Sequence, residues 1–419
     1  MAFKKFVIFV ILFFQLLVVF PAHILVPMDD SQRNHLKAYG IAYLVLTKDV
    51  EVSWLLNYRG GSFMFPYSRV FEEECFARGV SIQIIADVQA NAILDEISSP
   101  NVNMEEIRLH KVPRIAVYTP PNSLPWDDAV TLALTYAEIP YDAIYDEDVI
   151  RGVLPMYDWL HLHHEDFTGQ FGKFWAAYRN APWYQEDVRL QEEAARRLGF
   201  SKVSHMKLEV AKRIRDFVTG GGYLFAMCSA PESLDIALAA EGVDILHEVF
   251  DGDPIDPNAQ EKLDFSKTFA FHNFIINTNP AIYEKSNIDV PKTGRNELTD
   301  FFTLFEFSAK WDPVPTMLTQ NHATVLKGFM GQSTAFRNET IKPTVTILGE
   351  TRAKNEARYI HGTLGKGTFT FLGGHDPEDY RHFVGDLPTD LDNYPNSPGY
   401  RLILNNVLFP AARKQKQKT

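Results

Sequence analysis

Two side chains with complementary chemistry stand at the ends of predicted strands that are far apart in the sequence. Cys228 directly follows the apolar run 223–227 and precedes a predicted helix. His375 follows a second apolar run, and Asp376 and Glu378 stand beside it. A thiol at such a turn lies near the positive end of the helix dipole, which favours the thiolate. A cysteine, a histidine base and a carboxylate that orients the histidine are the groups that nucleophilic catalysis needs.

A second polar cluster follows the predicted strand 157–162. Because side chains alternate along a strand, two of its histidines share one face, and the residues after them fall on the turn beyond. Two histidines and a carboxylate can bind zinc or another transition metal, and the metal candidates are His161, His163 and Glu165. A substrate-binding role and a purely structural role stay open, since the spacing matches no established metal motif. The polar residues of this cluster are His161, His163, His164, Glu165 and Asp166.

An alternation of strands and helices positions these residues. Chemistry in such folds gathers at the carboxyl ends of parallel strands, so the cysteine and the histidine run are expected to line one crevice. Asp127 and Asp128 open a predicted helix, where acids suit the helix dipole and cap the helix. A hairpin around 365–367 delivers the downstream histidine. The predicted strands are 114–120, 141–145, 157–162 and 223–227, and the predicted helices are 126–138, 204–219, 231–241 and 401–409.

The order of these features resembles the class I glutamine amidotransferase-like superfamily over residues 111–410. The segments that carry the resemblance are the strand–cysteine–helix turn and the run Gly-Gly-His-Asp-Pro-Glu at 373–378. The resemblance implies a flavodoxin-like, doubly wound three-layer α/β sandwich. It also implies Cys228 as nucleophile, His375 as base, and Glu378 or Asp376 as orienter. The sequence departs from the family pattern in two places, because the cysteine turn lacks glycine and the acid stands one position further on.

Four segments of the whole chain resemble a group of exported Bacteroidetes proteins commonly labelled asparagine synthetase B. They are HLKAYGIAYLVL, WLLNYRGGSF, LPWDDAVTLALTYAEIPYD and YDWLHLHHEDFTGQFGKFW. True asparagine synthetases of that name have a different pattern. They carry a nucleophilic cysteine directly after the initiator methionine, followed by a Ser/Gly-rich ATP-pyrophosphatase loop. Here position 2 is Ala2, and no SGGxDS-type loop is found. The sequence therefore supports a resemblance to this group of exported proteins, but it contradicts the label asparagine synthetase.

The first 22 residues have the pattern of a secretory signal peptide. Lys4 and Lys5 precede the apolar stretch 6–20, which is shorter than the roughly 20 residues of a membrane span. Phe20 is bulky for a position close to a cleavage site near Ala22, so an uncleaved inner-membrane anchor is the alternative. The sequence predicts an exported protein, periplasmic or secreted.

The domain organisation follows from these patterns. An α/β rhythm before the amidotransferase-like region predicts an extension with a parallel sheet, and residues 99–113 are interpreted as a linker. The predicted parts are a signal peptide (1–22), an α/β N-terminal extension (23–110), the amidotransferase-like domain (111–410) with insertions at 167–203 and 242–345, and a basic tail (411–419).

Composition narrows the functional classes. The 419 residues are 46% hydrophobic and 22% charged, with a net charge of −12, which is typical of a globular protein and excludes disorder and coiled coil. The acidic balance argues against a nucleic-acid partner. Two cysteines build no disulfide framework, and Cys75 is interpreted as structural.

Three functions fit the sequence. The first is a Cys-dependent amide or ester hydrolase, and the second is a non-catalytic module of the same fold that binds a small molecule, a peptide or a sugar. The third is a metal-dependent hydrolase built on the HLHHED run at 161–166, with zinc as the candidate metal. No other cofactor is predicted.

Overall fold

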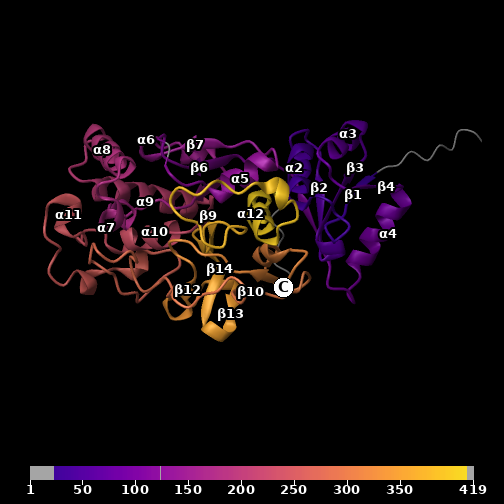
Figure 1. Ribbon diagram of the computed structural model, residues 1–419. Coiled ribbons are helices and arrows are strands. Elements are labelled where there is room, and N and C mark those ends of the chain that lie inside the picture. Colours follow the sequence, from indigo (N-terminus) through magenta and orange to yellow (C-terminus); the bar gives the residue numbers. More distant parts are fainter. Residues whose placement is uncertain (1–22, 123, 413–419) are drawn as a thin grey trace, which may run out of the picture.

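The computed structural model describes residues 23–122 and 124–412, which form two β-sheets of different topology. The predicted signal peptide lies outside the described residues, and so does the basic tail from residue 413 onward. None of the helices in the described ranges combines the length and apolar character that a bilayer crossing requires. Figure 1 shows the smaller sheet, formed by the N-terminal residues, at one end of the molecule.

The smaller sheet is wholly antiparallel, with the strand order β4-β1-β3-β2-β5. The predicted parallel sheet in this region is wrong. The tight turn at 57–61 joins β2 directly to β3, and a turn that short permits only antiparallel pairing. The interpretation of 99–113 as a linker is also wrong, because β5 lies within it. The strands are β1 (His23–Val26), β2 (Val52–Leu56), β3 (Ser62–Pro66), β4 (Gln83–Ile85) and β5 (Glu105–Leu109).

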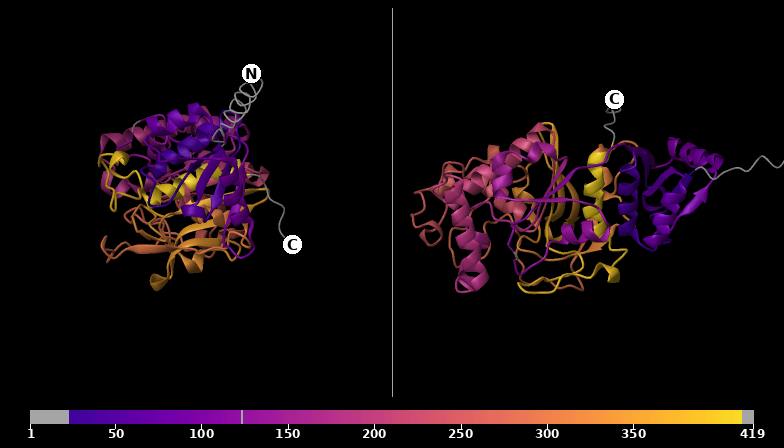
Figure 2. Two further views of the ribbon diagram at one scale, coloured as in Figure 1. Left: turned by 90° about the vertical axis from the view of Figure 1, so that its right-hand side faces the viewer. Right: turned by 90° about the horizontal axis from the view of Figure 1, so that it is seen from above.

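One helix joins the two sheets into a continuous core. Helix α2 (His35–Leu46) begins at Asn34, whose side chain accepts a hydrogen bond from the Lys37 N–H. Its apolar residues pack against the smaller sheet on one side and against α5 and α12 on the other. In Figures 1 and 2, α2 lies between the antiparallel sheet and α12. The smaller sheet also carries α3 (Arg69–Ala77) and α4 (Asp87–Ser98).

The larger sheet is mixed, with ten strands in the order β11-β10-β13-β14-β15-β9-β8-β6-β7 and β12 paired to β14. From β15 to β7 all pairings are parallel, and the remaining pairings are antiparallel. The predicted hairpin is formed by β14 and β15. The parallel strands are β6 (Ile115–Tyr118), β7 (Asp142–Ile144), β8 (Trp159–Leu162), β9 (Tyr223–Met227) and β15 (Gly367–Leu372). The others are β10 (Phe301–Leu304), β11 (Val325–Lys327), β12 (Phe336–Arg337), β13 (Thr346–Thr351) and β14 (Glu356–Leu364).

Helices cover both faces of the parallel strands, so the α/β class predicted from the sequence is confirmed. Val117 and Phe225 face one apolar cluster with α5 and α12, while Ala116 and Leu224 face a second cluster with α9 and α10. This alternation is the two-residue period of a strand buried on both faces. The helices are α5 (Ala129–Tyr136), α6 (Asp146–Arg151), α9 (Val203–Gly220), α10 (Ala230–Ala239) and α12 (Pro398–Leu408).

The two segments predicted as insertions differ in structure. Residues 167–203 carry α7 (Trp175–Tyr178) and α8 (Pro182–Arg197). Residues 242–345 are mostly irregular, with α11 (Glu248–Asp251) and the short strands β10, β11 and β12. Seen from above in Figure 2, residues 167–203 lie at the end of the molecule opposite to the smaller sheet. The segment 242–345 also reaches the smaller sheet, because Lys310 Nζ donates a hydrogen bond to the Ile97 carbonyl and the Asn57 N–H donates one to Gln320 Oε1. Both segments contribute walls to the cavity described below.

The contact between α2 and α5 generates a stability prediction. A Cβ atom at Gly40 would lie 1.8 Å from the backbone oxygen of Ala137, so Gly40→Ala must push the two helices apart. We expect the free energy of unfolding to fall by about 1–3 kcal/mol or more in urea denaturation. Gly220→Ala is the matched control, since a Cβ there meets no atom within 4 Å. Equal unfolding curves for the two variants would contradict this packing.

Candidate active site

The nucleophile candidate sits on a strained turn between a central strand and a helix. β9 ends at Met227 and α10 begins at Ala230, and Cys228 between them has φ +53°, a left-handed conformation that few non-glycine residues adopt. The Cys228 N–H donates a hydrogen bond of 3.1 Å to the Gly374 carbonyl, which ties this turn to the end of β15. The side chain is 3% exposed and lines a cavity. A strained strand-to-helix turn is a recurrent support for catalytic nucleophiles.

The structure brings His375 to the sulfur of Cys228. β15 and β9 are adjacent parallel strands, so the residues that follow them meet at one edge of the sheet. A His375 ring nitrogen lies within 4.8 Å of Sγ. The sulfur also accepts a hydrogen bond of 3.2 Å from the Gln332 N–H. The thiol and the imidazole predicted from distant parts of the sequence therefore form a pair.

Neither acid predicted as orienter faces the histidine ring. The Asp376 carboxylate accepts hydrogen bonds from the Tyr400 hydroxyl at 2.7 Å and from the Glu378 N–H at 2.8 Å. The Glu378 carboxylate is hydrogen-bonded to the side chain of Ser397. Adjacent residues after a strand point to opposite sides, which directs Asp376 away from the His375 ring. The predicted orienting roles of Glu378 and Asp376 are therefore corrected by this geometry.

The carboxylate beside His375 belongs to Asp127, from the loop between β6 and α5. Its Oδ1 lies 3.6 Å from His375 Nε2 and 3.2 Å from His382 Nε2. The His382 ring stacks on the His375 ring with centroids 4.3 Å apart, and its Nδ1 lies 2.9 Å from Asp379 Oδ2. A chain of alternating acids and histidines thus runs from Asp379 to Cys228. The sequence pattern identified Asp127 only as a helix-opening acid, and it gave no signal for His382.

The electrostatics of this chain favour a charged pair. Burial alone would lower the pKa of His375, but the neighbouring Asp127 carboxylate and Cys228 sulfur raise it to about 10. Burial alone would raise the pKa of the Cys228 thiol, but the proximity and the charge of His375 leave it below its ordinary value. Burial likewise opposes ionisation of Asp127, whose pKa is nonetheless lowered by His375 and His382. These directions favour a thiolate beside an imidazolium over a neutral thiol beside a neutral imidazole.

The histidines of the 161–166 run separate into different environments. Asp128 caps α5 by accepting hydrogen bonds from the N–H groups of residues 130 and 131, as predicted. Its Oδ2 lies 3.2 Å from His161 Nε2, and its Oδ1 lies 3.2 Å from His163 Nδ1. His161 also contacts the Phe225 carbonyl through Nδ1 at 3.2 Å. His161 is therefore fully buried and does not line the cavity at Cys228.

The two acids of the run, Glu165 and Asp166, do not line the cavity that contains Cys228. Glu165 accepts a hydrogen bond of 2.9 Å from the His163 N–H, and burial raises the pKa of its carboxyl to about 8. Asp166 accepts hydrogen bonds from Thr168 and from the Gly172 N–H, which fix the following loop. Of the five predicted substrate-binding residues, only His164 lines the cavity at Cys228. Glu165 does not belong to the side-chain groups whose atoms converge within ligand distance, so the predicted metal set is corrected in this respect.

A cavity of about 560 Å³ opens onto the Cys228–His375 pair. The Trp126 and Phe174 rings stack with centroids 5.3 Å apart on one wall. Lys292 lies on another wall with its Nζ 5.1 Å from the centroid of the Tyr283 ring. The cavity walls include five aromatic residues, two cations and one acid: Trp126, Phe174, Tyr178, Tyr283, Phe383, Lys292, Arg381 and Glu284. The cavity can hold a small molecule or the end of a peptide, with apolar surface and an anionic group.

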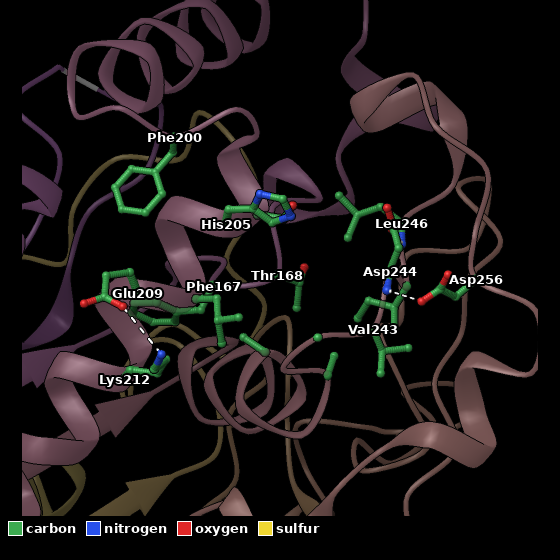
Figure 3. Close-up of a pocket in the computed structure, with 16 residues that line it drawn as sticks. Phe167, Thr168, Phe200, His205, Glu209, Lys212, Val243, Asp244, Leu246 and Asp256 are labelled. Carbon is green, nitrogen blue, oxygen red and sulfur yellow. Dashed lines mark hydrogen bonds and ion pairs between the residues drawn. The ribbon is translucent and has the colours of Figure 1, made fainter.

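A second cavity, of about 470 Å³, lies between α9, α10 and the loop that follows α10, as Figure 3 shows. Phe167, Phe200 and Val243 give it apolar walls. The Glu209–Lys212 ion pair, at 3.7 Å, stands on one side of it. This cavity contains neither Cys228 nor His375 in its lining, so it is separate from the candidate active site.

Comparisons with known proteins leave the function open. No family model and no curated protein matches the chain. Among solved structures, the chain is similar to cytoplasmic proteins STM3548 and STM1381 of Salmonella typhimurium. The identities are 10% and 11%, the TM-scores 0.34 and 0.35, with 72% and 71% of this chain and 100% and 99% of those chains covered. A third is Gan42B, a GH42 β-galactosidase from G. stearothermophilus, at 13% identity and TM-score 0.27, covering 64% of this chain and 28% of that one. Likenesses this weak assign neither family nor activity.

The charged pair predicts the reactivity of Cys228. In a Cys75→Ser protein freed of metal with a chelator, we expect iodoacetamide alkylation to follow a titration with a midpoint below 9.0, the value of an ordinary thiol. His375→Gln should move the midpoint upward and slow the reaction at pH 7 by roughly tenfold per pKa unit, because burial then acts unopposed. Cys228→Ser in the chain that retains Cys75 is the control, because burial raises the pKa of the remaining thiol to about 12 and it should react slowly. A midpoint at 9.0 or above in the parent would contradict the pair.

The orienting acid can be identified by a matched pair of variants. Asp127→Asn removes the carboxylate that raises the pKa of His375, so the pKa of His375 should fall. Because less of the positive charge then stands beside the sulfur, the alkylation midpoint of Cys228 should move upward. Glu378→Gln changes an acid that stands near His375 in sequence but is hydrogen-bonded to Ser397, and it should leave the alkylation midpoint unchanged. The reverse result would restore Glu378 as the orienter. Alkylation rates from pH 5 to 11, measured by mass spectrometry, provide the comparison.

Proposed function

We propose that this chain is a Cys-dependent hydrolase of amides or esters with a class I glutamine amidotransferase-like fold. The observation that carries the proposal is Cys228 on its strained turn, with His375 beside it and Asp127 behind the ring. The parallel strands with helices on both faces support the finer fold assignment, which rests on the sequence resemblance. Membership of the exported group labelled asparagine synthetase B, and export itself, are parts of the same proposal. They rest on the sequence patterns alone.

The proposed reaction uses the residues in fixed roles. The Cys228 thiolate attacks the carbonyl carbon of the substrate, and its C–S bond forms as the carbonyl π bond opens. When the tetrahedral adduct collapses, the imidazolium of His375 gives its proton to the leaving amine or alkoxide, and a thioester remains. His375, now neutral, takes a proton from water, whose oxygen attacks the thioester. Collapse releases the acid and restores the thiolate–imidazolium pair, while Asp127 holds the ring and stabilises its charge.

The cavity suggests the substrate class. Trp126 and Phe174 offer stacked apolar surface next to the sulfur, which suits an aromatic or otherwise planar group. Lys292 and Arg381 supply positive charge on the walls, which suits a carboxylate or another anion. We propose a small anionic amide or ester, or the end of a peptide, as the substrate.

Hydrolysis of chromogenic anilides and p-nitrophenyl esters that carry a carboxylate tests the proposal. We expect the wild type to release the chromophore and to form a covalent adduct on Cys228, detected as a mass increase that hydroxylamine removes. Cys228→Ser and His375→Gln should reduce the rate at least about a hundredfold, because removing a nucleophile or a base typically costs this much. Equal hydrolysis by Cys228→Ser and the wild type would overturn the hydrolase proposal.

A non-catalytic binding module of the same fold is the second candidate. The observation that favours it is burial, since Cys228 is only 3% exposed beneath the cavity walls. For this function, a ligand identified by thermal shift would bind Cys228→Ser and the wild type with the same affinity, and no thioester would form. The hydroxylamine-sensitive adduct therefore separates the two candidates.

A further inference from the structure

Three ligand atoms of the types that zinc prefers converge beneath the cavity. Cys228, His163 and His375 are buried, and one ligand atom from each lies within 4.8 Å of the others. They follow or end three neighbouring parallel strands, β8, β9 and β15, so the sheet itself fixes their separation. Thiolate sulfur and imidazole nitrogen are ligand types that zinc binds, and three protein ligands leave the fourth position of a tetrahedron open.

A second, independent observation points to a ligand at this place. His163 is 0% exposed, and its Nε2 has no hydrogen-bond partner within the residues that the structure describes. A buried polar atom without a partner destabilises a fold, so such atoms usually mark a bound water or ion.

The carboxylates behind the histidines complete the arrangement. Asp128 Oδ1 lies 3.2 Å from His163 Nδ1, and Asp127 Oδ1 lies 3.6 Å from His375 Nε2. Histidines that bind metals commonly direct their other ring nitrogen to a carboxylate, which fixes the tautomer and the ring orientation. This arrangement leaves His163 Nε2 and the opposite nitrogen of His375 as the atoms available to an ion.

We propose that Cys228, His163 and His375 bind a zinc ion, and that the bound ion switches off the nucleophile. This inference rests on the proposed function, because it concerns regulation of the same cysteine. On binding, the sulfur donates to Zn²⁺ the lone pair with which it would attack a carbonyl. The ion displaces the proton shared by the Cys228–His375 pair, and this proton leaves to solvent. No oxidation or reduction takes part. Asp127 and Asp128 balance the positive charge of the ion.

Metal binding is tested on the full chain carrying Cys75→Ser, so that Cys228 is the sole thiol. The metal-free protein is titrated with Zn²⁺ against a chromophoric chelator, and with Co²⁺ as a spectroscopic probe. We expect one ion per chain, a thiolate-to-Co²⁺ charge-transfer band and the visible bands of tetrahedral Co²⁺. Absence of the charge-transfer band would overturn the site. Because the cobalt spectrum needs no ligand variant, it decides the question even where a variant fails to fold.

Two histidine variants assign the ligands. His163→Gln should weaken Zn²⁺ binding at least about tenfold. His164→Gln is the matched control, because its ring faces the cavity next to the same strand end and lies outside the group of three. His164→Gln should therefore retain the affinity. Loss of binding in His164→Gln with retention in His163→Gln would overturn the assignment. Circular dichroism establishes that each variant is folded before it is compared.

The regulatory part is tested by protection of the thiol. Saturating Zn²⁺ should slow iodoacetamide alkylation of Cys228 at least about tenfold, and a chelator should restore the rate. In His163→Gln, Zn²⁺ should give no protection. A reactive thiolate without Zn²⁺ binding would overturn this inference and leave the hydrolase proposal intact. Hydrolysis by the zinc-loaded form alone would retain the site, but it would overturn both the switch and the Cys-dependent hydrolase.

Discussion

The arrangement of the site depends on stabilising a negatively charged sulfur at a buried position, that of Cys228. A buried charge is costly unless an opposite charge lies next to it, and His375 supplies that charge to Cys228. The imidazolium in turn needs Asp127, without which burial would favour its neutral form. The three groups therefore form one electrostatic unit. The fold assembles this unit from the ends of β9 and β15 and from the loop after β6.

Much of the positioning could be predicted from the sequence, because it depends on local patterns. Apolar runs placed the strands before Cys228 and His375, and parallel neighbours carry the residues after them to one edge of the sheet. Which strands pair is less local, so the same rhythm wrongly predicted a parallel sheet before residue 110. The acid that lies beside the His375 ring was the least predictable part of the site. Asp127 reaches His375 only after two loops fold against each other, whereas Glu378 merely stands near it in sequence.

The adjacent acids Asp127 and Asp128 show how one loop serves two clusters. Neighbouring side chains diverge, so Asp127 faces His375 while Asp128 faces His161 and His163. Asp128 also caps α5, which packs against α12 in the apolar layer below. The helix start, the sheet histidines and His375 are therefore coupled through one turn. The helix-capping pattern accounts for Asp128, but it does not predict that Asp127 lies beside His375.

The two clusters meet where the His163 and His375 rings lie 4.5 Å apart. At that place a single lone pair on the Cys228 sulfur has two uses, since it can attack a carbonyl carbon or bind a soft metal ion. The same hydrogen bonds and charges that favour the thiolate favour both uses, because both need the deprotonated sulfur. Geometry separates them. Attack requires a substrate in the cavity, whereas metal binding requires His163 and His375 together with the sulfur. A site built for an activated thiol next to an unpartnered histidine is thus also a site for its metal inhibitor.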